Sequence, residues 1–209
     1  MKREEKNQRS KDKILVAAIA EFGTKSYENA SLNTICSNNN ISKGLIYHYF
    51  ENKDALYLCC VKACFDQLTK FLGRKRYDFT DFQNGINKYL ASRYQFFHEY
   101  PHYSYIFFST ILQPPTHLIK QIEELRNDFD AQGTQYYKTA LEHIVLRENV
   151  TEEEAMEYFL TFQKMFNGFF GSSTYENSDF NSLIEAHELK LSKILNMILY
   201  GIAKEKTEP

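Results

Sequence analysis

The sequence is poor in the residues that interrupt helices, and it has no tryptophan. Its 209 residues include only four prolines and eight glycines, which favours long helices over many turns. The sequence also lacks an apolar run near the roughly 18 residues that a membrane-spanning helix needs. Its charged N-terminus is not followed by the apolar segment and cleavage site of a signal peptide. We therefore expect a cytoplasmic protein without a membrane segment.

Cysteine is also scarce, and the four cysteines show no pattern of pairs or metal ligands. Cys59, Cys60 and Cys64 fall within one predicted helix, whereas Cys36 lies in another element. A zinc site would need further ligands at compatible spacing, and none is near in the sequence. We expect reduced thiols, no metal and no cofactor.

Charge is divided mildly along the chain. Residues 1–55 carry nine Lys and Arg against seven Asp and Glu, whereas the remainder carries sixteen against twenty. A weakly basic head on an acidic body fits local contact with phosphates. The same distribution argues against general adhesion to nucleic acids.

Apolar residues recur at three- and four-residue steps along most of the chain, and this periodicity predicts helices. Ser10 is expected to cap the first helix, and Gly23 is expected to end it as the C′ residue. Thr151 and Glu154 have the spacing of a capping box at the start of a later helix. No strand or repeat is evident, so the predicted fold class is all-α with about nine helices. Helices are expected near residues 52–73, 81–98, 102–112, 116–147, 152–171 and 180–203.

Residues 31–50, SLNTICSNNNISKGLIYHYF, have the pattern of two short helices joined by a tight turn. Ser31 and Ser42 are suited to cap the two helices, and Asn40 tolerates the left-handed backbone that the turn requires. The second helix, Lys43–Tyr49, is too polar on one side to be core. Its lysine, glycine, histidine and two tyrosines suit the phosphate-lined major groove of DNA.

These residues give the N-terminal segment a strong resemblance to the DNA-binding domain of the TetR/AcrR/QacR transcriptional regulators. The resemblance covers about residues 8–68, and beyond residue 70 only helix number and length are similar. It implies an N-terminal three-helix head with a helix-turn-helix (8–68) on a helical ligand-binding and dimerisation body (69–209). The matching residues are Ile14, Ala18, Phe22, Gly23, Ser31, Ile35, Ile41–Gly44, Ile46, Tyr47, Tyr49, Phe50, Asn52, Lys53 and Leu56.

Two positions depart from the usual family pattern. Asn40 stands where glycine is common, and the turn chemistry tolerates that change. Leu45 stands where a small or hydroxyl residue is common; it cannot hydrogen-bond a base, but it is suited to pack on a thymine methyl group. The departure therefore bears on the operator sequence and not on DNA binding.

The resemblance assigns roles to individual residues. Tyr47, Tyr49 and Lys53 are expected to contact phosphates, and so is Ser31 at its helix N-terminus. Lys43, Gly44 and His48 are expected to approach bases, the glycine by letting the backbone come close. The expected DNA-binding residues are Ser31, Ser42, Lys43, Gly44, Leu45, Tyr47, His48, Tyr49 and Lys53. The expected core of the helix-turn-helix is Ile35, Ile41, Ile46 and Phe50.

Lys53 would lie in the first turn of the fourth helix, after the capping residue Asn52. A cation there opposes the helix dipole. The position is explained if a phosphate lies against the same helix end, because the exposed N–H groups and the lysine then serve one anion. The alternative is a solvated lysine.

The last two helices carry apolar residues over more of their circumference than a single buried face requires. One three-helix unit reads only a few base pairs, so such proteins act as dimers on two half-sites. The family places the dimer interface on these two helices, and we expect a homodimer on a double-stranded DNA operator. The interface candidates are Phe162, Phe169, Leu191, Ile194, Leu195 and Ile198.

The middle helices are dense in aromatic residues, and the family implies a ligand pocket among them. Aromatic faces favour flat or cationic hydrophobic ligands, and Glu123, Glu124 or Asp128 are suited to neutralise a cation. We therefore expect a small hydrophobic or cationic-aromatic ligand, with ordinary core packing as the alternative for each residue. The pocket candidates are Tyr94, Phe97, Tyr103, Phe107, Phe108, Tyr137 and Phe166.

Signs of catalysis are weak, and we expect no enzyme activity. The sequence has no glycine-rich phosphate loop and no nucleophile elbow. His98 and His102 have the spacing of a helical metal pair, but Pro101 is expected to break the helix between them.

The function that fits best is a repressor released from a near-palindromic operator when a small hydrophobic ligand binds the C-terminal domain. The alternative is a DNA-binding dimer of the same fold that acts in chromosome organisation or through a protein partner, without a small-molecule inducer.

Overall fold

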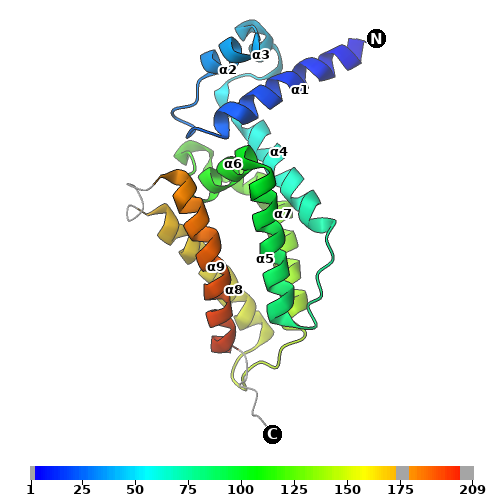
Figure 1. Ribbon diagram of the computed structural model, residues 1–209, viewed down its shortest axis with the longest axis vertical. Coiled ribbons are helices and arrows are strands. Elements are labelled where there is room, and N and C mark those ends of the chain that lie inside the picture. The colour runs from blue at the N-terminus through cyan, green and yellow to red at the C-terminus, as the bar shows by residue number, and fades with distance from the viewer. Residues whose placement is uncertain (1–2, 173–178, 203–209) are drawn as a thin grey trace. The chain divides into compact units, whose positions relative to one another are not determined.

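The computed structural model describes residues 3–172 and 179–202, and these residues form nine α-helices and one 3₁₀ turn (Figure 1). No β-strand occurs in those two ranges, so the prediction of an all-α fold with about nine helices is confirmed. The elements are α1 (Arg3–Phe22), α2 (Leu32–Asn39), α3 (Lys43–Tyr49), α4 (Lys53–Gly73), α5 (Phe82–Glu99), α6 (Pro101–Leu112), η1 (Thr116–Leu118), α7 (Ile119–Leu141), α8 (Glu152–Gly171) and α9 (Phe180–Ile202).

Several helix ends lie where the local chemistry predicts them. The Thr151 hydroxyl accepts a hydrogen bond from the Glu154 N–H at 3.2 Å, and the Glu154 carboxylate accepts one from the Thr151 N–H at 2.9 Å. This reciprocal pair is the predicted capping box of α8. Pro101 begins α6 immediately after α5 has ended, so the predicted break between His98 and His102 is confirmed.

Two predicted boundaries are wrong. Ser10 is not a cap, because α1 already begins at Arg3 and the Ser10 hydroxyl donates to the Lys6 carbonyl inside the helix at 3.0 Å. Arg, Glu, Lys and Gln are good helix formers even without an apolar face. The prediction relied on apolar periodicity and therefore missed the polar turns of α1.

The helix expected over residues 116–147 is shorter at both ends. It opens with the 3₁₀ turn η1 and ends at Leu141. After that residue, the His143 N–H bonds to the Ala140 carbonyl and the Ile144 N–H to the Leu141 carbonyl. These three-residue steps tighten the last turn and end the α-helix.

Packing divides the chain into two compact units. The first contains residues 1–68 and 97–128, and the second contains residues 69–96 and 129–209. The divisions fall within α4, α5 and α7. The assignment of residues 8–68 and 69–209 to two functional domains stays a prediction.

In the first unit, α1 packs on both α2 and α6. Ile14, Ala18 and Phe22 are buried along one side of α1. At its end, Gly23 meets the start of α6 so closely that an added Cβ would lie 2.5 Å from the Cβ of His102. None of the described glycines has a positive φ. Gly23 directly follows the last residue of α1, as predicted, and it is required for the space between two helices and not for a left-handed backbone.

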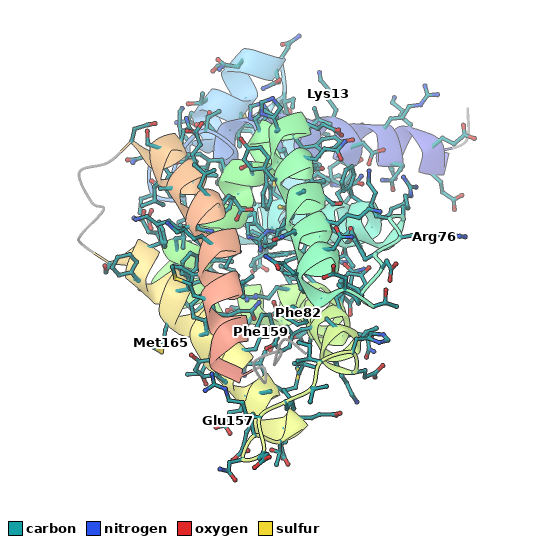
Figure 2. All side chains as sticks on the ribbon, turned by 60° about the horizontal axis from the view of Figure 1, so that its bottom comes forward. Lys13, Arg76, Phe82, Glu157, Phe159 and Met165 are labelled. Atoms are coloured by element: carbon teal, nitrogen blue, oxygen red, sulfur yellow. The ribbon has the colours of Figure 1, made fainter. Side chains whose placement is uncertain are left out.

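In the second unit, aromatic stacking joins α7 to α8. The rings of Tyr137 and Phe159 lie 3.7 Å apart at an interplanar angle of 7°, and Leu141 and Ala155 are buried beside them. Phe82, at the start of α5, packs against the same cluster (Figure 2). Tyr137 and Phe159 thus form a core across two helices that are separated by a loop in the sequence.

The second unit also contains a buried polar network. Arg93 on α5 forms an ion pair with Glu188 on α9. His187 is 1% exposed, with Nδ1 3.1 Å from Glu188 Oε1 and Nε2 3.1 Å from Asn167 Oδ1 on α8. Burial lowers the pKa of His187, although the bond to Glu188 opposes this effect.

We expect Gly23→Ala to destabilise the protein, because the new methyl group would force α1 away from α6. Overpacking of this kind costs roughly 1–3 kcal/mol, which a thermal or urea melt would detect. Gly44→Ala is the matched control, since no atom lies within 4 Å of an added Cβ there. Alanine is the better helix former, so the control should be as stable as the wild type or more so. Equal melting curves for both variants would contradict the close approach.

We also expect acid to destabilise the wild type through His187. A depressed folded pKa means that the unfolded chain binds the proton more tightly, so this contribution is full above pH about 6.5 and is lost as the pH falls below it. His187→Gln removes the titrating group and should make stability less dependent on pH between 7 and 5. Melting temperatures measured across that range would test this. A wild-type slope no steeper than that of the variant would show that His187 is not held neutral.

Candidate nucleic-acid interface

The turn between α2 and α3 depends on one residue with left-handed backbone. Asn40 has φ 51° and ψ 52° and is the one non-glycine residue with a positive φ in the described chain. On either side of the turn, Ser31 accepts a hydrogen bond from the Asn33 N–H at 3.2 Å, and Ser42 accepts one from the Leu45 N–H at 3.2 Å. All three local predictions are confirmed.

Helix α3 has one buried side and one open side. Ile46 is fully buried, and Ile35, Ile41 and Phe50 are at most 5% exposed. These four residues are the predicted core of the helix-turn-helix, and the structure buries all of them. The opposite side of α3 presents the polar residues to solvent. Ser42, Lys43, Gly44, Tyr47 and His48 are exposed, and Ser31, Leu45, Tyr49 and Lys53 are partly exposed.

Gly44 has no packing role within the described protein. An added Cβ would find no atom within 4 Å, so the glycine is not required by a neighbouring helix. Its neighbour Tyr47 keeps 49% of its surface exposed. The exposed surface at Gly44, with Tyr47 and Lys43 beside it, suits the approach of a large partner.

Lys53 at the start of α4 lies in a cluster that sequence reasoning missed. Its Nζ lies 4.4 Å from the ring centroid of Tyr27, and the Tyr27 hydroxyl donates to Asp54. His117 of η1 approaches the same carboxylate oxygen, with Nε2 3.4 Å from Asp54 Oδ1, and its ring packs edge-on against the Tyr27 ring at 5.5 Å. Tyr27, Asp54 and His117 are far apart in the sequence, and no motif joins them.

The charges of this cluster affect one another. Burial lowers the pKa of Lys53, and the carboxylates of Glu28 and Asp54 partly restore it. The hydrogen bond from Tyr27 holds the pKa of Asp54 below its ordinary value, and burial together with Asp54 raises the pKa of Tyr27. Lys53 is therefore a cation with a fixed position at a helix N-terminus, where an anion also meets open N–H groups. Asn52 caps that helix through the Ala55 N–H at 2.8 Å, as predicted.

The predicted ligand-pocket residues fall into separate packing groups. Phe97, Phe107 and Phe108 contact one another at 4.8–5.1 Å in the first unit. In the second unit Tyr137 stacks on Phe159, and Phe166 packs on Phe162, Phe170 and His187. Tyr103 is partly exposed, and Tyr94 is 48% exposed. Their role as pocket residues stays a prediction.

The structure also has a surface pocket of about 380 Å³ in the first unit, between α1 and α2. Its lining includes Glu21, Thr24, Lys25, Asn38 and Asn39. It contains none of the predicted ligand-pocket residues.

The predicted dimer residues are partly open on α8 and α9. Phe169 is 51% exposed, Phe162, Ile194 and Leu195 are intermediate, and Leu191 is buried. The side chain of Ile198 lies outside the described residues. Beside the predicted set, the same two helices have further exposed apolar side chains: Leu160, Met165, Leu189 and Met197.

The described residues form neither a metal site nor a membrane span. No group of three or more His, Cys, Asp or Glu side chains there is placed to hold a metal ion. Cys60 and Cys64 are buried free thiols, and Cys36 and Cys59 are partly exposed. Within the described chain, no helix is long and apolar enough to cross a membrane.

The exposed face of α3 and the Asn40 turn match a known family. Residues 14–60 match the family model for bacterial regulatory proteins of the tetR family. The chain therefore carries a TetR-family DNA-binding head. Its N-terminal head is the helix-turn-helix by which these regulators bind DNA, so the resemblance is confirmed.

Three related proteins show how far the similarity extends. A TetR-family regulator from Chloroflexus aurantiacus has a TM-score of 0.61 at 17% identity, with 95% of each chain covered. FadR from Bacillus subtilis, in complex with stearoyl-CoA, has a TM-score of 0.59 at 13% identity, covering 86% of this chain and 96% of FadR. Both similarities concern the fold.

The third is similar in sequence. IcaR of Staphylococcus aureus strain Newman, described as the negative transcriptional regulator of the biofilm operon icaADBC, is 34% identical over 90 residues. That match covers 43% of this chain and 45% of IcaR, so the chain spans somewhat less than half the length of this curated relative.

Proposed function

We propose that this TetR-family protein is a cytoplasmic transcriptional repressor that binds a near-palindromic operator as a homodimer. A small hydrophobic ligand in the C-terminal helices would release it from DNA. The observation that carries the DNA-binding part is the two-sided α3, which buries Ile46 completely and exposes Lys43, Gly44, Tyr47 and His48. The description of IcaR as a negative regulator supports repression.

The exposed face of α3 divides into base and phosphate contacts. Lys43, Gly44 and His48 would approach base edges in the major groove. Tyr47 and Tyr49 would place their hydroxyls on phosphates and so set the register of the helix. Ser42 and Leu45 lie at the same end of α3, where the leucine would contact a thymine methyl group.

The phosphate contacts continue beyond α3. Lys53 supports one such contact because its ammonium is already held over the Tyr27 ring at the N-terminus of α4. Ser31 would provide another at the N-terminus of α2. These positions on either side of the recognition helix would hold the head against the DNA backbone.

Dimerisation is supported by the apolar surface of α8 and α9. Met165 is 68% exposed and Phe169 51% exposed on α8, and Leu189 is 72% exposed and Met197 60% exposed on α9. Burying such side chains against a second copy removes apolar surface from water. This burial stabilises the dimer by about 25 cal/mol for each Å² of apolar surface. A dimer would also give the two heads that a near-palindromic operator requires.

Ligand binding would shift the dimer between two conformations. In one, the distance between the two DNA-binding heads fits the operator, and in the other it does not. The aromatic groups around Phe107 and around Phe166 support a hydrophobic ligand. FadR of Bacillus subtilis shares the fold and is described as a complex with stearoyl-CoA, so a long acyl group is one class of ligand to test. The ligand of the present protein is proposed to be hydrophobic or cationic-aromatic.

We expect Tyr47→Ala and Lys53→Ala to weaken binding to all DNA sequences. Loss of the lysine should also reduce the slope of log K against log salt by roughly one for each head, because one ionic contact is lost. Fluorescence anisotropy with DNA selected from a random pool, repeated at several salt concentrations, would measure both effects. Lys138→Ala, an exposed lysine on α7, is the control and should leave the slope unchanged. An unaltered slope for Lys53→Ala would remove its phosphate role.

We further expect the inducing ligand to bind the free protein more tightly than the operator complex. Stearoyl-CoA and tetraphenylphosphonium are suitable probes, one acyl and one an aromatic cation. Calorimetric titration of each into free protein and into the operator complex would give the two affinities. Equal affinities would rule out release by that compound, since only differential binding shifts a two-state equilibrium.

A further inference from the structure

The N-terminal half of α1 is a helix without a core. Residues 4–9 and 11–13 are exposed, and Ser10 is intermediate. Only from Ile14 onward does α1 bury apolar side chains. An isolated helix of this length is marginal in water, and a helix that is polar all round normally has a partner or a set of internal pairs. The first three turns of α1 extend past the ends of α2 and α3 (Figure 1).

Charged residues of both signs recur at helical steps in these turns. Lys6, Arg9 and Lys13 follow one another at steps of three and four residues, and this spacing places them on one side of a helix. The set is named the basic stripe below. Glu5, Gln8 and Asp12 have the same spacing, with the Gln8 amide donating to Asp12 Oδ1 at 2.7 Å, and they border the stripe beside Arg9.

Three contacts place this part of α1 beside the recognition helix. The Tyr49 hydroxyl donates to Asn7 Oδ1 at 3.3 Å, and Lys11 Nζ lies 6.0 Å from the Phe50 ring centroid. Lys13 Nζ donates to the carbonyl of Asn40, the turn residue between α2 and α3, at 3.4 Å. Lys13 stands out from the α1 ribbon (Figure 2). The last contact places Lys13, at the end of the basic stripe, against the turn before α3, whereas Asn7 and Lys11 lie on the side of α1 that faces Tyr49 and Phe50.

Lys6 and Arg9 have no carboxylate partner among the residues that the structure describes. An anion would therefore meet two open cations on the exposed turns of α1. From Lys6 to Lys13 the helix rises about 10 Å, which is the axial length of about three base pairs of DNA. A membrane surface fits less well, because interfacial helices carry a large apolar face and these turns have none.

We infer that the basic stripe of α1 is a second DNA-binding element, which contacts the phosphate backbone next to the bases approached by α3. This inference rests on the proposed function. Lys13 is held at the turn by Asn40, while Lys6 and Arg9 contact phosphates farther along the strand. Because phosphates carry no sequence information, the stripe adds affinity and salt dependence without changing which operator is preferred.

The test uses the full chain with Lys6→Gln and Arg9→Gln combined. Glutamine keeps helix propensity close to that of lysine and arginine, and both positions are exposed, so α1 should fold normally. Lys88→Gln with Lys138→Gln is the matched control: these lysines are exposed in the second unit and give the same change in net charge. Anisotropy with pool-selected DNA at several salt concentrations measures affinity and slope for all three proteins.

We expect the α1 double variant to lose roughly tenfold in affinity for each missing contact at about 0.1 M salt, and its salt slope to fall by roughly two for each head. Its ratio of affinities for selected and random DNA should stay at the wild-type value. In the wild type, amide hydrogen exchange of residues 4–13 should slow on DNA binding. The control should match the wild type.

The outcomes separate the two proposals. If the wild type selects no sequence from the pool, the proposed function fails and this inference fails with it. If the wild type selects DNA but the α1 double variant keeps its salt slope, only the inference is overturned. An equal loss in both double variants would also overturn it, because net charge alone would then explain the effect.

Discussion

A helix of seven residues does not keep its shape in water without help, and α3 is such a helix with one side left open. Isolated helices shorter than about 12 residues are marginal because nucleation is costly. Its stability therefore comes from the other side. Ile46 is completely buried, Phe50 closes the C-terminal end and Ser42 caps the N-terminal end. Every exposed group that is proposed to contact DNA depends on this small buried patch.

The need to bury one side of α3 also explains why the turn before it requires one specific backbone conformation. Asn40 must adopt a left-handed conformation so that Ile41 returns to the core directly after α2. A residue with a branched side chain would be strained there. The Asn40 carbonyl also accepts the Lys13 ammonium, which adds a tie between the turn and α1. Local backbone geometry and a contact from a distant residue therefore hold one turn in place.

Sequence reasoning was accurate where the determining forces are local. The caps at Ser31, Ser42 and Asn52, the capping box of α8 and the Asn40 turn all depend on residues within four positions of one another. Their chemistry can be read from the sequence. The four core residues of the helix-turn-helix followed from apolar spacing, because one short helix leaves few alternatives for its buried side.

The sequence was less informative where residues meet from distant segments. The Tyr27, Asp54 and His117 cluster joins a loop, a helix start and a 3₁₀ turn, and no spacing rule connects them. Gly23 was correctly predicted at the end of α1, where a left-handed backbone is the commonest reason for a glycine. The actual reason is His102 on another helix. The start of α1 was missed because helix propensity without an apolar face gives a weak signal.

The position of Lys53 over the Tyr27 ring has a kinetic consequence. A lysine side chain normally loses considerable rotamer entropy when it is fixed in a complex, and here much of that freedom is already lost in the free protein. For the proposed phosphate contact, the cost of ordering is met during folding and not during association. Such a contact should lengthen the lifetime of the complex more than it speeds encounter, since differences among related complexes reside mostly in dissociation rates. The aromatic ring of Tyr27 would thereby set how long the head remains on DNA.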